Sequence, residues 1–212
     1  MRKLLRLPPF AALMVGVIGL AGLALGAGCT TGYNPLQDFE SVSPATELEV
    51  PLASASRTAN YPAEQLSRGK YLVKLLGCGI CHTDGALIGD PNYALNLAGS
   101  RIGIAYTNPL VDKHPGVIYP SNITPDVETG IGSWSESEIV RLLGSGETSH
   151  DRQLLAVMPW PTYAWITDSD ALSIAAYLLS LPPVKHRVPD NVPAGRMASS
   201  PYVHFGVYRS RH

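Results

Sequence analysis

Five consecutive residues, Cys78-Gly79-Ile80-Cys81-His82, constrain this chain more than any other part of its sequence. Two thiols lie three positions apart at the end of a predicted helix, and an imidazole follows at once. Cys-x-x-Cys-His is the pattern of covalent haem attachment, because the thiols can reach two vinyl groups on one porphyrin edge while the imidazole points at the iron. The motif predicts one covalent haem c held by Cys78 and Cys81, with His82 as an axial ligand.

Two other kinds of site use closely spaced cysteines. A structural zinc ion needs four ligands, and the chain has only three cysteines, of which Cys29 lies in another segment. A thioredoxin-like dithiol also uses C-x-x-C, but there the motif follows a strand and begins a helix within a βαβ pattern. Here it follows a helix and leads into a Gly-rich loop, which favours haem over both.

The iron of a stable electron carrier needs a sixth ligand. Met1 and Met14 lie in the N-terminal segment, which leaves Met158 and Met197. Met158 precedes Pro159 in a predicted loop that could cross the other haem face, whereas Met197 lies in a tail without a pattern. We therefore expect Met158 to bind the iron. The remaining candidates, each expected at the surface, are His114, His150, His186 and His204.

Residues 1–28 have the pattern of an export signal. Arg2, Lys3 and Arg6 precede nineteen uncharged residues, and such cations keep the amino terminus on the cytoplasmic side. The stretch ends in small residues before Cys29, which resembles a bacterial lipoprotein box where the thiol receives a lipid. The alternatives are an uncleaved membrane helix of about 28 Å and a simple cleaved signal. The first two predict a protein anchored to a membrane and facing the periplasm.

The rest of the chain divides into three predicted parts. Residues 29–61 are rich in Ser, Ala, Thr, Pro and acids without an apolar period, which is typical of a flexible tether. Residues 62–184 form the predicted haem domain. Residues 185–212 form a basic tail with prolines and aromatic residues.

Helical periodicity appears three times within the haem domain. Each helix has a recognisable start, either a proline in its first turn or a Ser or Thr with an acid three residues later. Each also ends at glycine or proline. These starts and ends are Pro62 and Gly77, Ser135 (with Glu138) and Gly144, and Thr167 (with Asp170) and Pro182. Residues 84–132 are predicted as long loops. We therefore expect an all-α fold, in which few short helices and long loops wrap around one haem.

Charge is unevenly distributed along the chain. The formal net charge of −1 argues against a nucleic-acid binder built on basic patches. Residues 29–184 nevertheless carry 8 cations and 16 acids, whereas residues 185–212 carry five cations and one acid. An acidic module is expected to meet a redox partner with a basic patch, and this complementarity acts mainly on the rate of encounter.

From residue 66 to residue 184 the chain resembles the class I c-type haem modules in cytochrome subunits of membrane-bound alcohol, aldehyde and gluconate dehydrogenases. The matching stretches are 68–72, the haem motif with Thr83, 98–101, 118–126, 129–135, 158–160 with Tyr163, and 170–184. The resemblance implies a cytochrome c fold and iron ligation by His82 and Met158. It also implies that the first helix packs near Gly69 against the last near Tyr177, and that the 122–125 loop and Trp160 lie close to the haem.

These observations favour a one-electron carrier rather than an enzyme. In this interpretation a membrane-tethered mono-haem cytochrome c accepts an electron from a dehydrogenase and passes it to a cytochrome or oxidase. The protein supplies iron ligands, a pocket of low dielectric and an exposed haem edge. Two alternatives stay open. Met158 could leave the sixth site free for a gas sensor or redox enzyme, or the chain could be an accessory structural subunit that needs its haem for assembly.

Overall fold

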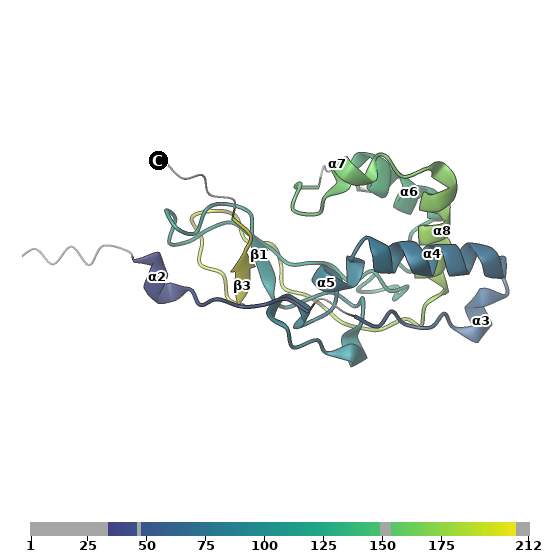
Figure 1. Ribbon diagram of the computed structural model, residues 1–212, viewed down its shortest axis with the longest axis horizontal. Helices are drawn as coiled ribbons and strands as arrows, with labels where there is room; N and C mark the ends of the chain where they lie inside the picture. The colour runs from purple at the N-terminus through teal and green to yellow at the C-terminus, as the bar shows by residue number, and fades with distance from the viewer. Residues whose placement is uncertain (1–33, 46–47, 149–153, 207–212) are drawn as a thin grey trace, which may run out of the picture. The chain divides into compact units, whose positions relative to one another are not determined.

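The computed structural model describes residues 34–45, 48–148 and 154–206 (Figure 1). All of these except Asn34 belong to one compact unit that begins at Pro35. The predicted export signal, Cys29 and His150 lie outside the described residues. Within the described ranges, no helix is both long enough and apolar enough to cross a membrane.

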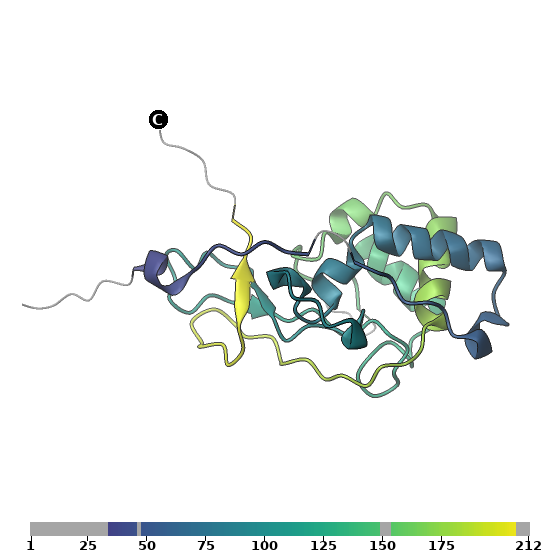
Figure 2. The ribbon, with the colours of Figure 1, turned by 60° about the horizontal axis from the view of Figure 1, so that its bottom comes forward.

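Helices predominate in this unit, and a small sheet accompanies them (Figures 1 and 2). The elements are α2 (Pro35–Asp38), α3 (Ala55–Thr58), α4 (Ala63–Leu75), α5 (Cys78–His82), the 3-10 turns η1 (Ala86–Ile88) and η2 (Tyr93–Leu95), β1 (Gly103–Ala105), β2 (Val117–Ile118), α6 (Glu136–Ser145), α7 (Trp160–Tyr163), α8 (Asp168–Ser180) and β3 (Tyr202–His204). The three helices predicted from periodicity are α4, α6 and α8.

The contact of α4 with α8 confirms the predicted packing of the first helix against the last. The two helices cross at Gly69, where an added Cβ would lie 1.9 Å from the carbonyl oxygen of Ser173 and 2.7 Å from Cβ of Tyr177. Beside the crossing, Arg68 forms an ion pair with Asp170, with 2.8 Å between Nε and Oδ1. Close approach of the two backbones therefore requires glycine at position 69.

The start of α6 is also confirmed, and the helix runs slightly further than expected. The Ser135 hydroxyl accepts a hydrogen bond from the Glu138 amide, and the Glu138 carboxylate accepts one from the Ser135 amide. The helix continues through Gly144 to Ser145, because Gly146 supplies the left-handed conformation (φ 70°) that closes the last turn.

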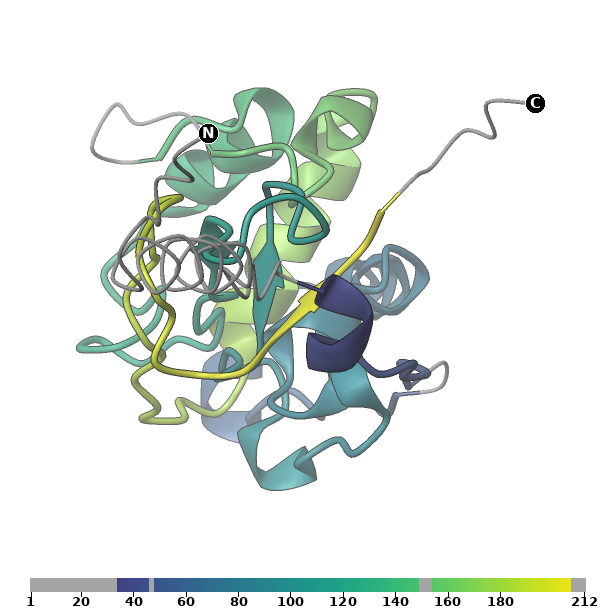
Figure 3. The same cartoon turned by 90° about the vertical axis from the view of Figure 1, so that its left-hand side faces the viewer.

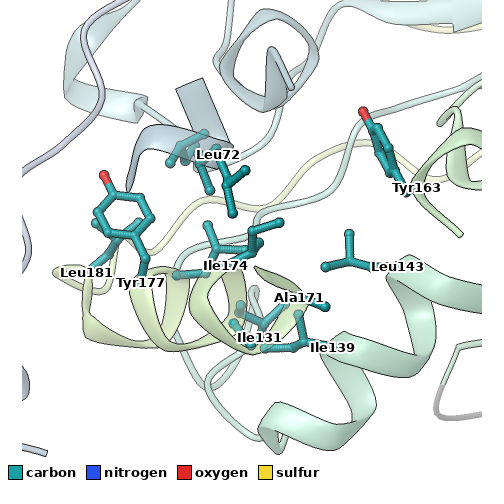
Figure 4. Packing of buried hydrophobic residues seen from close by; sticks show 13 residues of the cluster. Leu72, Ile131, Ile139, Leu143, Tyr163, Ala171, Ile174, Tyr177 and Leu181 are labelled. Carbon is teal, nitrogen blue, oxygen red and sulfur yellow. The ribbon is translucent and has the colours of Figure 1, made fainter. Parts of the chain in front are cut away.

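The helices enclose one apolar core, the helical cluster (Figure 4). Its side chains come from α4, α6, α7, α8 and the loops between them, and Tyr163 closes one side. The members are Leu72, Val73, Leu97, Ile131, Ile139, Leu143, Tyr163, Ala171, Ile174, Ala175, Tyr177, Leu178 and Leu181.

A three-stranded sheet in the order β2-β1-β3 departs from the all-α expectation. β1 pairs antiparallel with β2, Ile104 opposite Ile118, and parallel with β3, Ile104 opposite Val203. Part of the predicted loop at 84–132 and part of the C-terminal tail thus satisfy each other's backbone groups. Leu87, Ile104 and Val203 form a second core, the sheet cluster.

Part of the predicted tether lies on the domain. The amides of Ala45 and Ser54 donate hydrogen bonds of 2.8 Å to the carbonyls of Ala86 and Ser180. The Tyr177 hydroxyl donates to the carbonyl of Pro51. Residues 39–45 and 48–54, the strap, therefore pair with α8 and η1, although their composition alone is typical of a linker.

Candidate haem-attachment site

The cysteine motif forms its own short helix, α5, directly after α4. Gly77 makes this possible, because its left-handed conformation (φ 67°) turns the chain between the end of α4 and the start of α5. Both thiols are unbonded and half-buried. Cys78 packs against the helical cluster, whereas Cys81 packs against the sheet cluster. The motif therefore lies between the two cores of the unit.

The surroundings of the thiols favour uncharged sulfur. Burial raises the pKa of Cys78 to about 12 and also raises that of Cys81. Redox dithiols work in the opposite way, through a lowered thiol pKa. Within the described ranges, no group of three or more His, Cys, Asp or Glu side chains is placed to hold a metal ion. Thioethers to haem carry no charge and fit this apolar setting.

His82 is oriented by a backbone carbonyl. Its Nδ1 lies 2.7 Å from the carbonyl oxygen of Ser121, so Nδ1–H donates and Nε2 is left for a metal. Burial lowers the pKa of His82, and the hydrogen bond to Ser121 opposes that change. Burial therefore favours the neutral imidazole, the form in which histidine binds metals. The amide of Gly99 fixes the backbone by donating to the His82 carbonyl over 2.8 Å.

The loop that presents the Ser121 carbonyl is held by Asn122, which is only 2% exposed. Its Nδ2 donates to the carbonyl of Val184 at 2.7 Å and to Oγ1 of Thr129 at 3.0 Å. Its Oδ1 accepts from the amide and hydroxyl of Thr124. Asn122 thus ties the loop behind His82 to the segment that follows α8.

Met158 precedes α7, in the part of the chain that packs beside the motif. It is half-buried against the helical cluster, whereas Met197 is 78% exposed. The Tyr163 hydroxyl of α7 lies 3.5 Å from the carbonyl of Leu76, at the end of α4. Burial raises the pKa of Tyr163 to about 12, and the neighbouring Cys78 and Cys81 add to the rise. The structure therefore brings α7 next to both cysteines.

Taken together, these donor groups fit a covalent haem. The two thiols lie in one short helix, α5, and the oriented imidazole of His82 ends it. The half-buried thioether of Met158 packs against the same cluster as Cys78. Trp160 is held nearby, because its Nε1 donates to the carbonyl of Leu154 at 3.1 Å and its ring lies against Gly146.

Several contributors to this site were not predicted from the sequence. The carbonyl of Ser121 could not be recognised, because any residue type supplies one. Arg101 lies in one of the stretches that resemble the cytochrome family, but no sequence pattern pairs it with Asp84. The Asp84 carboxylate accepts hydrogen bonds of 2.7 Å from the backbone amide and from the guanidinium of Arg101. The described histidines also differ from a surface placement. His114, His186 and His204 are half-buried, and Nδ1 of His186 lies 2.9 Å from the carbonyl of Ala98.

Comparison with known proteins shows which proteins this chain is similar to. No family model matches the chain. Over a little more than half its length, however, the chain is similar to cytochrome c subunits of dehydrogenases at 32–35% identity. The names of these relatives imply haem c and are consistent with a non-catalytic, electron-carrying role beside a dehydrogenase.

Individual relatives extend well beyond this chain. One of the subunits of nicotinate dehydrogenase from Pseudomonas putida is 34% identical over 132 residues, which are 62% of this chain and 10% of that protein. The fructose dehydrogenase cytochrome subunit of Gluconobacter japonicus is 35% identical over 115 residues, 54% of this chain and 21% of that relative. A diheme cytochrome c-type protein of Cereibacter sphaeroides is 26% identical, with 56% and 37% covered. The chain thus spans well under half of each.

Proposed function

We propose that this chain is a mono-haem c-type cytochrome with a class I cytochrome c fold, which carries single electrons from a dehydrogenase to a downstream cytochrome or oxidase. The bound haem would supply the one-electron iron couple. The observation that carries the proposal is the geometry of α5, where two neutral thiols precede an imidazole whose Nδ1 is held 2.7 Å from the Ser121 carbonyl.

Two residues would attach the haem to the chain, and two others would bind its iron. Cys78 and Cys81 would form the thioethers, and His82 and Met158 would bind the iron. The loop fixed by Asn122 carries the Ser121 carbonyl and so keeps the His82 ring in place. A thioether ligand favours reduced iron and raises the reduction potential relative to two histidines.

The proposal includes export and anchoring. The N-terminal signal would carry the protein to the periplasmic side of a bacterial membrane, where a lipid on Cys29 or the uncleaved segment 10–28 would retain it. The excess of acids over cations in residues 29–184 supports a partner with a basic docking surface.

The test is expression of the full chain in a bacterial host that matures c-type cytochromes. We expect haem to stay on the polypeptide in a denaturing gel, and a haemochrome assay to give one haem per chain. The reduced protein should be low-spin and should not bind carbon monoxide. Haem that extracts into acidified solvent would contradict attachment, and carbon monoxide binding would favour the alternative with an open sixth site.

A further inference from the structure

Exposed apolar side chains gather where the strap meets the turns η1 and η2. Val42 of the strap and Ile88 of η1 are each 41% exposed, and Tyr93 of η2 is 53% exposed. The two segments are in contact, because a Cβ added at Gly89 would lie 2.6 Å from the carbonyl oxygen of Ser43. Apolar side chains that cluster at a surface, rather than occurring singly, mark sites where another molecule binds.

The same two segments carry acids but no lysine or arginine. Residues 34–45, 48–54 and 84–100 contain no Lys or Arg, and their described acids are Asp38, Glu40, Glu49, Asp84 and Asp90. Glu40 and Asp90 are exposed. Asp84 is buried, and its charge is offset by the ion pair with Arg101, which follows this stretch. The apolar side chains therefore lie in a surface with an excess of acids, whereas the helix α4 carries three cations.

Glu40 and Asp90 lie on the same side of the unit. The ring of Phe39 meets the ring of Tyr202 in β3, with 6.1 Å between their centroids. Asp90 lines an open hollow together with residues 200–201, which directly precede Tyr202. Figure 3 shows the purple strap and the blue-teal turns in its lower half, away from the green helices α6 and α7. The two carboxylates thus accompany the exposed apolar side chains.

This surface also lies next to the haem-attachment helix. Leu48 of the strap packs on α5, with its Cδ1 3.3 Å from a Cβ added at Gly79. Asn96 connects the strap to the end of the motif, because its Nδ2 donates to the Glu49 carbonyl and its Oδ1 accepts from the Thr83 hydroxyl at 3.1 Å. A haem joined to the two cysteines of α5 would have its attached edge close to the strap.

We propose that Glu40, Val42, Ile88, Asp90 and Tyr93, the acidic face, form the surface on which the redox partner docks, and that this partner presents cations around an apolar centre. The inference rests on the electron-transfer role in the proposed function and adds its place on the molecule. The partner's cations would meet the two carboxylates at the rim, and its apolar side chains would meet the three between them. Charge complementarity steers such an encounter and fixes its orientation, whereas the cations of α4 would repel the same partner.

The experiment uses the full oxidised holoprotein and zinc-substituted mitochondrial cytochrome c, a basic protein, as the probe. A flash excites the zinc porphyrin, which loses one electron to the ferric haem of this chain, and the decay of the excited state gives the rate. At about 0.01 M salt the screening length is about 30 Å, and there Glu40→Gln/Asp90→Asn should react at least about fivefold more slowly than wild type. Val42→Ser/Tyr93→Ser should lower the rate at high salt as well, because it removes apolar contact.

Glu64→Gln/Glu147→Gln is the matched control. It removes two exposed acids and so changes the net charge equally, but its positions in α4 and after α6 lie outside the acidic face. Its rate should stay within about twofold of wild type. An unchanged visible spectrum and urea midpoint check the fold of each variant, and Tyr93→Ser alone serves if the apolar double variant fails.

The outcomes separate the docking face from the carrier role. Equal rates in the face variant and its control would overturn the acidic face, as would amide shifts that place the probe on α4. Covalent haem and reduction by dithionite would still be measurable, so the carrier role would stand. Self-association that protects amides 88–93 without the probe would assign the face to a second copy instead. A chain without covalent haem would overturn the proposed function and the docking face together.

Discussion

The helical part and the sheet part of this unit reach their order in different ways. α4, α6 and α8 carry their own start signals and apolar faces, and the helical cluster forms where those faces meet. The strands have only two or three residues each, and Ile104 finds its partners 14 and 99 positions away. A part built from local signals can form early, whereas a part built from distant pairs must first close long loops. The cysteine motif joins them, with one thiol on each core.

Removing both thiols should produce the largest effect. In Cys78→Ala/Cys81→Ala we expect complete loss of covalent haem and of cooperative unfolding, because neither core is large enough to persist without the group between them. A haem-stained denaturing gel and a urea titration measure this. In the wild-type holoprotein, native-state hydrogen exchange should show the sheet part losing protection before α4 and α8.

Cys29→Ser is the matched control, because it removes a thiol outside the motif. It should keep its haem and its unfolding transition. If the double variant retained a cooperative transition with protected strands, the sheet part would not depend on haem, and the contrast between the two parts would fail.

The next largest effect concerns the sixth ligand. Met158→Ala should open the iron to carbon monoxide and lower the reduction potential, because the thioether that favours reduced iron is gone. Met197→Ala is the control, since its side chain is 78% exposed, and it should change neither property. The reverse result, seen by carbon monoxide difference spectra and redox titration, would show that the tail supplies the ligand.

Within the helical part, Gly69→Ala tests the crossing of α4 and α8. The added methyl would meet the Ser173 carbonyl oxygen at 1.9 Å, so we expect the free energy of unfolding to fall by about 3 kcal/mol. Gly144→Ala in α6 is the control, because nothing lies within 4 Å of its added Cβ. That variant should gain roughly 0.5–1 kcal/mol from helix propensity. Equal effects in urea unfolding would contradict the close crossing.

In the segment that follows β2, Asn122→Ala tests the side chain that fixes the backbone behind His82. The variant removes the Nδ2 that donates to the Val184 carbonyl at 2.7 Å and the Oδ1 that accepts from the amide and hydroxyl of buried Thr124. A lost buried partner costs about 1–3 kcal/mol. The exposed Asn92, which accepts from the Ala94 amide at 3.1 Å, provides the control Asn92→Ala with a smaller loss. The haem spectrum should also shift only in Asn122→Ala, since only that loop carries the Ser121 carbonyl.

The same contrast explains what could be predicted from the sequence. The start of α6 could be predicted because Ser135 and Glu138, three residues apart, bond to each other's backbone amides. The spacing that places His82 beside two thiols is also a local pattern. The contact of Gly69 with Ser173 was accessible only through resemblance to a family, since no local rule connects positions 104 residues apart. The tail strand at Tyr202 and the strap at Ala45 were missed, because their order comes from distant backbone partners. The amino-acid composition of a segment does not show which distant backbone groups it will pair with.

The smallest expected effect lies in the ion pair between α4 and α8. Hydrogen bonds from Arg68 lower the pKa of Asp170, against an opposing effect of burial. A carboxyl with a lowered pKa in the folded state stabilises the fold above its ordinary pKa of about 3.9, and this contribution is lost as pH falls through the lowered value. At neutral pH, Asp170→Asn should therefore lower the urea midpoint slightly. The difference from wild type should shrink below about pH 4.

The same urea titrations should be repeated at increasing salt concentration. Arg68 is 49% exposed at its side chain, so ions can screen the pair, and exposed pairs are weak in general. The difference in urea midpoint between wild type and Asp170→Asn should become smaller with added salt. The control Asp168→Asn, from the same first turn of α8, should have the urea midpoint of wild type. A gap that persists at low pH and high salt would mean that Asp170 acts through α8 capping. The crossing of α4 and α8 would then be stabilised by the close approach at Gly69 and not by the ion pair of Arg68 with Asp170.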